Sequence, residues 1–235
     1  MDKNEIKIKE TLGITKESIL NQKHNLWIGL SFGNKWFTKN NIERLIDFGL
    51  KHTKKSLLIL IPGRLYVSNL RYIDNMSRAQ SLKKSFEIED EKIQEVGEII
   101  AKFKSEDQKK IILANYDDIL NPQAIKQREA LMREFSEQKN FYSLVMEIAT
   151  EILEIRGRTT TKERAESTAL YVLQELPLFL DGVNKIGTDA IHTVILYPGL
   201  GKLDDLVMRI ISDDEFLSLR ERLMIKNKTG IASVE

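Results

Sequence analysis

Apolar and polar residues follow two different periods along this chain, and the two periods alternate in its first half. Short apolar runs, typical of buried strands, cover residues 25–31, 57–61, 110–114 and 191–197. Apolar residues at helical spacing predict helices over residues 40–50, 124–135, 140–155 and 162–176, and residues 69–103 are predicted to be mostly helical. Strands that alternate with helices predict an α/β fold, in which an open parallel sheet is covered by helices.

No linker rich in proline, glycine or serine divides the chain, and no internal repeat or low-complexity segment is visible. We therefore predict a single α/β domain over residues 1–235. A chain of this length buries about 70% of the surface of its unfolded form, so its core needs no covalent staples. Residues 226–235 are predicted to form a flexible tail.

The composition excludes several classes of chemistry. The absence of cysteine removes disulfides, zinc–thiolate sites, iron–sulfur clusters and cysteine nucleophiles. The histidines His24, His52 and His192 are too widely spaced to form a local metal pair, and no metal is expected. Thirty-six basic and 35 acidic side chains give a net charge of +1. Nucleic-acid binding would therefore need a local basic patch.

The sequence carries no sign of a membrane protein. Its longest apolar run, 57–61, is far shorter than the ~20 residues that a membrane span requires. The polar N-terminus does not resemble a signal peptide. We therefore expect a cytoplasmic protein.

Ser31 follows the first predicted strand, within the sequence Gly29-Leu-Ser-Phe-Gly33. Ligands of open α/β sheets bind beyond the carboxyl ends of strands, so Ser31 is placed for chemistry. The pattern matches the G-x-S-x-G turn of α/β-hydrolases, although alone it is more typical of a simple strand-ending turn. A serine esterase would use Asp181 or Asp189 with His192, but the residues before Ser31 leave no room for the hydrolase's earlier strands.

Tyr171 and Glu175 lie four residues apart and share one face of a predicted helix. Pro177 predicts that this helix ends near Glu175, where the helix dipole disfavours a carboxylate. A phenol beside a disfavoured carboxylate is suited to binding a cation or moving protons. The spacing alone slightly favours a surface glutamate beside a packed tyrosine.

Tyr197 ends the last predicted strand, immediately before Pro198. Its hydroxyl group is able to relay a proton. Taken by itself, the position is more typical of an aromatic ring that closes the edge of the core.

Together, three segments resemble the cyclodipeptide synthase family. The first is Trp27-Ile-Gly-Leu-Ser31, followed by Asn34 and the aromatic pair Trp36-Phe37. The second is Tyr171-x-x-x-Glu175-x-Pro177 with apolar residues after it, and the third is Val194-Ile-Leu-Tyr197. Their order and spacing extend the resemblance over most of the chain.

The resemblance implies a Rossmann-like domain similar to the catalytic domain of class I aminoacyl-tRNA synthetases. It also implies an enzyme that makes a cyclic dipeptide, a diketopiperazine, from two aminoacyl-tRNAs. Ser31 would carry the aminoacyl and then the dipeptidyl group. Tyr171 and Glu175 would hold the amine, and Glu175 and Tyr197 would transfer protons. The HIGH and KMSKS signatures of synthetases are missing, which fits an enzyme that receives activated amino acids and needs no ATP, cofactor or metal. We also expect a monomer.

The resemblance further implies two amino-acid pockets. The first would be lined by Trp27, Gly29, Leu178, Phe179 and Ile195, with Asn34 nearby. The second would be lined by Ile148, Glu151, Ile152 and Ile155. Core packing would explain the apolar members equally well. Glu151 would either favour a cationic or hydrogen-bonding second amino acid or face solvent.

The chain departs from the family pattern in two places. It combines Asn34 with Tyr197-Pro198, which are features of two different subgroups. Where one subgroup carries an arginine-rich helix for tRNA, this chain has an acidic run over 87–98. The candidate tRNA-binding residues are Lys83, Lys84, Arg156, Arg158 and Lys162. A third possibility is an inactive, synthetase-like module that only binds tRNA.

Overall fold

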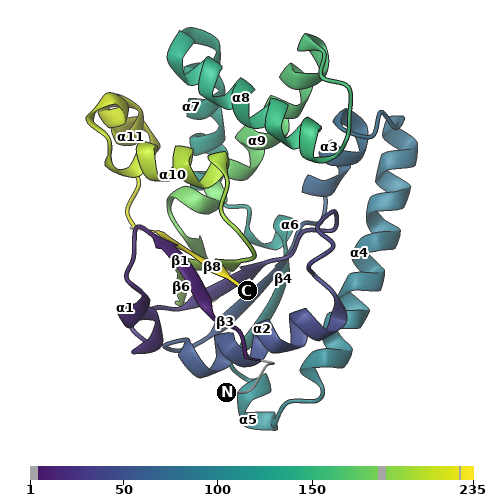
Figure 1. The fold of residues 1–235 in the computed structure, drawn as a ribbon, viewed down its shortest axis with the longest axis vertical. Helices are drawn as coiled ribbons and strands as arrows, with labels where there is room; N and C mark the ends of the chain where they lie inside the picture. The colour runs from purple at the N-terminus through teal and green to yellow at the C-terminus, as the bar shows by residue number, and fades with distance from the viewer. Residues whose placement is uncertain (1–4, 185–188, 228) are drawn as a thin grey trace.

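The computed structural model describes residues 5–184, 189–227 and 229–235, and a six-stranded sheet lies at its centre (Figure 1). The strands are β1 (Ile8–Leu12), β2 (Leu26–Gly29), β3 (Leu57–Ile61), β4 (Ile111–Asn115), β7 (Val194–Tyr197) and β8 (Gly230–Val234). Their order across the sheet is β1-β8-β7-β2-β3-β4, and only the β1–β8 pair is antiparallel. The predicted α/β fold with a largely parallel sheet is confirmed.

Two hydrophobic cores lie on opposite faces of the sheet, because successive side chains of a strand point to opposite sides. Trp27 and Ile28 of β2 enter different cores. One core packs against α2 (Lys39–His52) and α4 (Arg78–Ile100). The other packs against α7 (Pro122–Glu137), α8 (Lys139–Ile155), α9 (Lys162–Leu180), α10 (Lys202–Ser212) and α11 (Leu217–Leu223). Burial on both faces explains why the central strands are continuous apolar runs.

Helix α3 (Leu65–Tyr72) lies beside α9 (Figure 1). The Ser68 hydroxyl donates to Gln174 at 3.1 Å, and the Arg164 guanidinium donates to the Ile73 carbonyl at 2.6 Å. The remaining short elements are α1 (Lys16–Leu20), α5 (Ser105–Gln108), α6 (Tyr116–Ile119), a 3₁₀ turn over Asp214–Phe216, and the strand pair β5 (Val183–Asn184) and β6 (Ile191–His192).

The predicted flexible tail over residues 226–235 is wrong. Residues 230–234 form strand β8, which lies between β1 and β7 and is buried along its whole length. Gly230 packs so tightly against Ile14 that an added Cβ would lie 2.7 Å from it. The run Ile-Ala-Ser-Val is short and lies near the end of the sequence. Its apolar pattern is too brief to distinguish a strand from a flexible terminus.

The predicted end of the helix near Glu175 is also wrong, because α9 continues through Pro177 to Leu180. Pro177 removes one helical hydrogen bond, to the carbonyl of Leu173. Leu176, Pro177, Leu178 and Leu180 are all buried, and this packing maintains the helix. Glu175 therefore does not lie in the last turn, and the helix dipole does not explain its environment.

The predicted strand over 191–197 is divided in two. Residues 191–192 form β6, which pairs with β5, and only Val194–Tyr197 enter the main sheet. Thr193 still links the segments, because its N–H donates to Asn25 at 3.2 Å and its carbonyl accepts from Gly230 at 2.8 Å.

Candidate active site

Ser31 lies just beyond the carboxyl end of β2, next to the Leu30 N–H that donates to Leu60 of β3 at 3.0 Å. Strand β7 runs parallel to β2, so Tyr197 at its end reaches the same edge of the sheet. The Tyr197 hydroxyl hydrogen-bonds to the Ser31 side chain. The sheet therefore joins two predicted site residues that are far apart in the sequence.

Asn34 fixes the position of this pair. Its side chain hydrogen-bonds to the Tyr197 hydroxyl, and its Oδ1 atom accepts the Trp36 N–H at 2.9 Å. The Asn34 N–H donates to the Ser31 carbonyl at 3.2 Å, which closes the turn after β2. Asn34 thus connects the serine turn to the end of β7.

Glu175 is a partly buried carboxyl group on the face of α9 that Tyr171 shares. Burial raises the pKa of Glu175 to about 7, the hydrogen bond from Tyr171 and the charge of Arg156 lower it, and the charge of Asp204 raises it. Burial and the Glu175 charge raise the pKa of Tyr171, so this phenol stays protonated. The charge of Glu175 also reaches Tyr197, whose pKa is raised chiefly by burial.

Asn69 of α3 orients the Tyr171 hydroxyl. The Asn69 side chain hydrogen-bonds to Tyr171 and lowers its pKa, as a donor does. The Tyr171 hydroxyl in turn donates to Glu175. Asn69 is buried, and its Oδ1 atom has no hydrogen-bond partner. The result is a directed chain of amide, phenol and carboxyl groups with one free acceptor.

Asp204 is a second carboxyl group near Glu175, in the first turn of α10. Burial raises the pKa of Asp204 to about 6, while its 2.7 Å hydrogen bond from the Gly201 N–H opposes the shift. Sequence analysis missed Asn69 and Asp204, because neither lies in a recognisable motif. Two carboxyl groups that titrate near neutral pH are suited to proton transfer.

His192 does not pair with Ser31. It is fully buried at the amino end of β7, whereas Ser31 lies beyond the carboxyl end of the neighbouring β2. Its Nε2 atom contacts Ser56 Oγ at 3.1 Å, and its Nδ1 atom contacts the Val183 carbonyl at 3.3 Å. Burial lowers the pKa of His192 to about 4. His192 is therefore not placed to act as the general base that the serine-esterase alternative requires.

The sequence matches the family model described as cyclodipeptide synthase over residues 9–212. The chain belongs to the cyclodipeptide synthase family. Members of this family are tRNA-dependent aminoacyl-transferring enzymes, so the predicted family and enzyme class are confirmed. No curated protein matches the sequence.

Solved structures of cyclodipeptide synthases share the fold. That from Staphylococcus haemolyticus has a TM-score of 0.73 at 22% identity, covering 96% of this chain and 98% of its own. A Mycobacterium tuberculosis protein, described as relating cyclodipeptide synthetases to type I tRNA synthetases, has a TM-score of 0.72 at 13% identity and covers 100% and 97%. A synthase from Candidatus Glomeribacter gigasporarum bound to Phe-tRNAPhe has a TM-score of 0.56 at 13% identity and covers 88% and 86%.

Residues predicted to line the first pocket of this synthase lie together. Trp27 and Phe179 have ring centroids 5.8 Å apart. A Cβ on Gly29 would lie 3.1 Å from the Trp27 ring and 3.4 Å from Ile195 Cδ1, so glycine admits close packing here. Leu178 is buried in the same core.

The predicted second-pocket residues have unequal environments. Ile148 is buried in the core, Ile152 is partly buried, and Ile155 is 78% exposed. Glu151 is partly buried, and its Oε2 atom has no hydrogen-bond partner. Apolar packing therefore accounts for Ile148 but not for Glu151.

Most predicted tRNA-binding residues of this synthase are ion-paired. Arg158 lies 2.5 Å from Asp74, Lys162 lies 3.9 Å from Glu166, and Lys83 lies 3.9 Å from Glu87. Lys84 is exposed on α4. Arg156 instead reaches the turn that carries Ser31.

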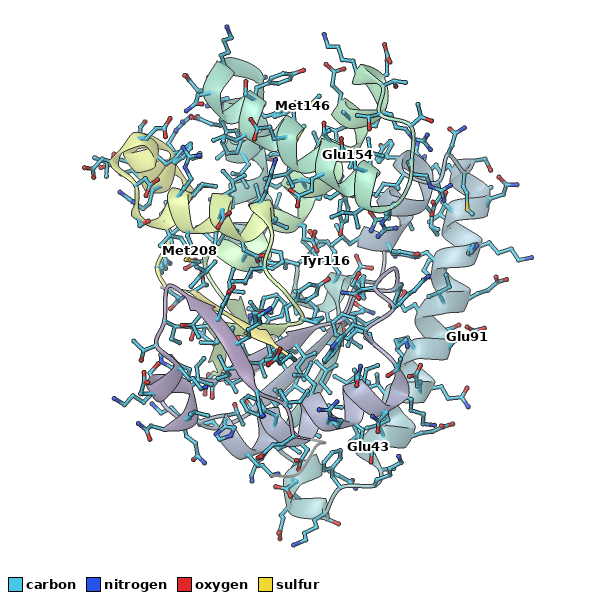
Figure 2. The ribbon with its side chains drawn as sticks, viewed as in Figure 1. Glu43, Glu91, Tyr116, Met146, Glu154 and Met208 are labelled. Carbon is cyan, nitrogen blue, oxygen red and sulfur yellow. The ribbon has the colours of Figure 1, made fainter. Side chains whose placement is uncertain are left out.

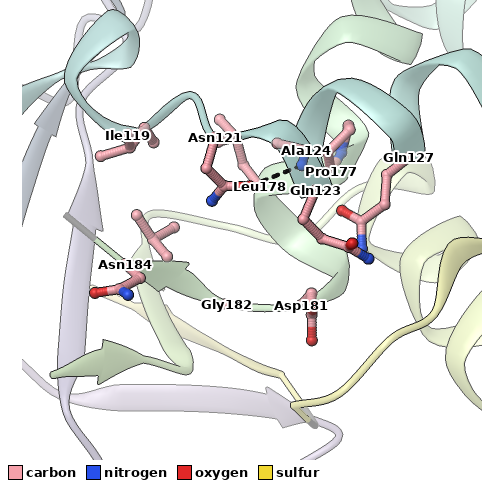
Figure 3. Close-up of a pocket in the computed structure, with 11 residues that line it drawn as sticks. Ile119, Asn121, Gln123, Ala124, Gln127, Pro177, Leu178, Asp181, Gly182 and Asn184 are labelled. Carbon is pink, nitrogen blue, oxygen red and sulfur yellow. Dashed lines mark hydrogen bonds between the residues drawn. The ribbon is translucent and has the colours of Figure 1, made fainter. Parts of the chain in front are cut away.

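A pocket at the C-terminal end of α9, which Pro177 and Leu178 help to line, belongs to the scaffold (Figure 3). The Asn121 side chain there caps α7 through the Ala124 N–H at 2.9 Å. Gln127 donates to the Leu223 carbonyl at 3.0 Å, and Asp181 accepts the Lys226 N–H at 2.7 Å. Internal bonds therefore occupy these polar groups, and none of the four predicted catalytic residues lines this pocket.

Tyr116, between the sheet and the upper helices in Figure 2, supports α9 from below. Its hydroxyl donates to the Gln174 carbonyl at 2.9 Å, one residue before Glu175.

Among the described residues, no helix is long and apolar enough to cross a membrane, and no cluster of three potential metal ligands occurs.

Proposed function

We propose that this chain joins the amino acids of two aminoacyl-tRNAs into a cyclic dipeptide through a covalent intermediate on Ser31. The observation that carries the proposal is the meeting of Ser31, Tyr197, Tyr171 and Glu175 at one edge of the sheet. The related synthase bound to Phe-tRNAPhe supports aminoacyl-tRNAs as the substrates.

In the first step, Ser31 Oγ attacks the ester carbonyl carbon of an aminoacyl-tRNA. A new ester bond to serine forms and the bond to the terminal ribose breaks. The serine proton passes to the ribose oxygen, with Tyr197 as the hydrogen-bonded relay. One ester replaces another of similar energy, so the step does not require a histidine base.

The second step uses the amine of the Ser31-bound aminoacyl group. The Tyr171 hydroxyl, the Glu175 carboxylate and the free Asn69 Oδ1 atom supply acceptors for its ammonium form. Because the pKa of Glu175 is about 7, the carboxylate is able to accept an ammonium proton near neutral pH. The freed amine attacks the second ester, the second tRNA leaves, and a dipeptide remains on Ser31.

In the last step, the free amine of the dipeptide attacks the Ser31 ester. The six-membered ring closes, the ester bond breaks, and the serine oxygen regains a proton. The first amino-acid side chain would lie against Trp27, Gly29, Leu178, Phe179 and Ile195. The second would lie near Ile148, Ile152 and Ile155, where Glu151 offers a free acceptor to a side chain that carries an N–H group.

The experiment that tests this function is intact-protein mass spectrometry after rapid mixing with charged total tRNA. We expect a mass increase equal to an amino-acid residue, carried by the peptide that contains Ser31. Ser31→Ala removes the nucleophile and should abolish the adduct. An unmodified wild-type protein that still forms cyclic dipeptide would exclude the covalent intermediate.

A further inference from the structure

The guanidinium group of Arg156 lies against the backbone of the serine turn. Arg156 is the C-cap residue of α8, and its side chain crosses to Gly33, two residues after Ser31. A Cβ atom built on Gly33 would lie 2.7 Å from Nη2, 3.0 Å from Cζ and 3.2 Å from Nη1. Three guanidinium atoms therefore contact a position that only a glycine leaves open.

The side chain of Tyr66 contacts this guanidinium, and the charge of the guanidinium also reaches the Glu175 carboxyl group. Arg156 hydrogen-bonds to the Tyr66 side chain, and the Tyr66 ring packs edge-on against Phe32 at 4.9 Å. Among the described residues, no carboxylate lies within ion-pairing distance of Arg156. By contrast, Arg158 lies 2.5 Å from Asp74.

An arginine that is partly removed from water and has no described carboxylate within ion-pairing distance is suited to bind an anion. Its planar donors match two oxygens of one phosphate group. In an aminoacyl-tRNA, the phosphate nearest the reacting ester is the one attached to the same terminal nucleotide, one sugar away. Ser31 and Gly33 are two residues apart, so their Cα atoms lie no more than ~7 Å from each other.

We propose that Arg156 binds the phosphodiester group of the terminal nucleotide of the aminoacyl-tRNA and thereby places the ester carbonyl over Ser31. This inference rests on the proposed function and adds a binding site to it. Gly33 is part of the site, because any larger residue displaces the guanidinium.

The test is a cycle that removes the arginine and the phosphate charge separately. The probe is an RNA microhelix that ends in CCA and is charged with an amino acid found in the cyclic product. A second microhelix carries a neutral methylphosphonate at the linkage before the terminal adenosine. The measured quantity is kcat/KM for formation of the aminoacyl-enzyme.

For the wild type, we expect the methylphosphonate to lower kcat/KM by about 10- to 100-fold, as the loss of a charge-assisted hydrogen-bonded pair does. With the natural phosphodiester, Arg156→Gln should lower kcat/KM by a similar factor. Replacing that phosphodiester by the methylphosphonate should lower kcat/KM of Arg156→Gln by less than about 2-fold more. Gly33→Ala should behave like Arg156→Gln. Lys55→Gln is the control, because Lys55 is exposed before the amino end of β3, at the edge of the sheet opposite Ser31, and this variant should keep the wild-type response.

The inference would be overturned if the methylphosphonate lowered kcat/KM by the same factor in Arg156→Gln as in the wild type. It would also be overturned by a shift of the pH profile in Arg156→Gln with the methylphosphonate loss unchanged, because Arg156 would then act only on the charge of Glu175. Arg156→Lys keeps the charge without the planar pair of donors, so its kcat/KM should lie between those of the wild type and Arg156→Gln. If the wild type forms no aminoacyl-enzyme with the natural linkage, the proposed function fails, and this inference fails with it.

Discussion

At the scale of single residues, Glu175 is a carboxyl group whose ionised form is disfavoured by its surroundings. Burial is the main cause, and the neighbouring Asp204 adds to it. Sequence analysis placed Tyr171 and Glu175 on one helical face, which the structure confirms. The predicted cause of the unfavourable environment of the Glu175 carboxylate was the helix dipole. That prediction is wrong, because the desolvation comes from the packing of other elements around α9. A sequence does not specify such packing directly.

Glu175→Gln should stabilise the protein more at pH 8 than at pH 5. The folded-state pKa is about 7 and the reference value is 4.5, so the folded chain binds more protons between these values. Stability contributed by this site is therefore present at low pH and is lost as the pH rises through 7. Thermal melts should show the variant several degrees above the wild type at pH 8 only. Equal differences at both pH values would contradict the buried, high-pKa carboxyl group.

Tyr171→Phe should raise the pKa of Glu175 further, because it removes the hydrogen bond that stabilises the carboxylate. The acid limb of the pH–rate profile for cyclic dipeptide formation should move to higher pH, and the rate at pH 7 should fall by about 10-fold or more. Tyr142→Phe is the matched control, since the Tyr142 hydroxyl donates to Glu166 at 3.0 Å, away from the site. If the acid limb of Tyr171→Phe stayed at the wild-type pH, the hydrogen bond from Tyr171 would not control the pKa of Glu175.

At the scale of elements, strand β8 shows where sequence patterns are insufficient. The long helices and the strands β2, β3 and β4 could be predicted, because each has a clear apolar period. Strand β8 is completed only by its neighbours, which bury a run of five residues on both faces. Tertiary packing also decides the conformation at Pro177. A proline usually ends a helix, but burial of the last turn of α9 maintains the helix to Leu180.

Ile231→Ala tests the role of β8. Ile231 is 1% exposed and belongs to the core between the sheet and helices α7 to α11, so truncation should leave a cavity on that face of the sheet. We expect a loss of about 2–5 kcal/mol in the free energy of unfolding, measured by chemical denaturation. Lys226→Ala, at an exposed position of the same terminal segment, should change it by less than about 0.5 kcal/mol. Similar small losses in both variants would favour a dispensable tail.

At the scale of the whole molecule, the net charge of +1 conceals an uneven surface. The sequence predicted the basic candidates Arg156, Arg158 and Lys162 but could not show which of them were already ion-paired. The partner of Arg158 is Asp74 from a distant segment, whereas the partner of Lys162 is Glu166, four residues along the same helix. The fold and the central site followed from ordered motifs, whereas the charge pattern required the folded chain.

Charge reversal of Arg156, Arg158 and Lys162 should weaken tRNA binding and its dependence on salt. Each lost phosphate contact should reduce the slope of log K against log salt by about 0.7–0.9. The matched control reverses Lys51, Lys54 and Lys55, which lie before the amino end of β3, opposite the edge that carries Ser31. Binding assays at several salt concentrations check this. An unchanged slope in the first variant would remove this patch from the tRNA interface.

We propose that the chain makes a cyclic dipeptide on Ser31, and this proposal is open to a test in living cells. The most direct test is untargeted mass spectrometry of the culture medium of cells that express the wild type, Ser31→Ala or an empty vector. We predict new diketopiperazine masses with the wild type alone, and their fragments will name both amino acids. Diketopiperazine production that persists undiminished in Ser31→Ala would contradict the account.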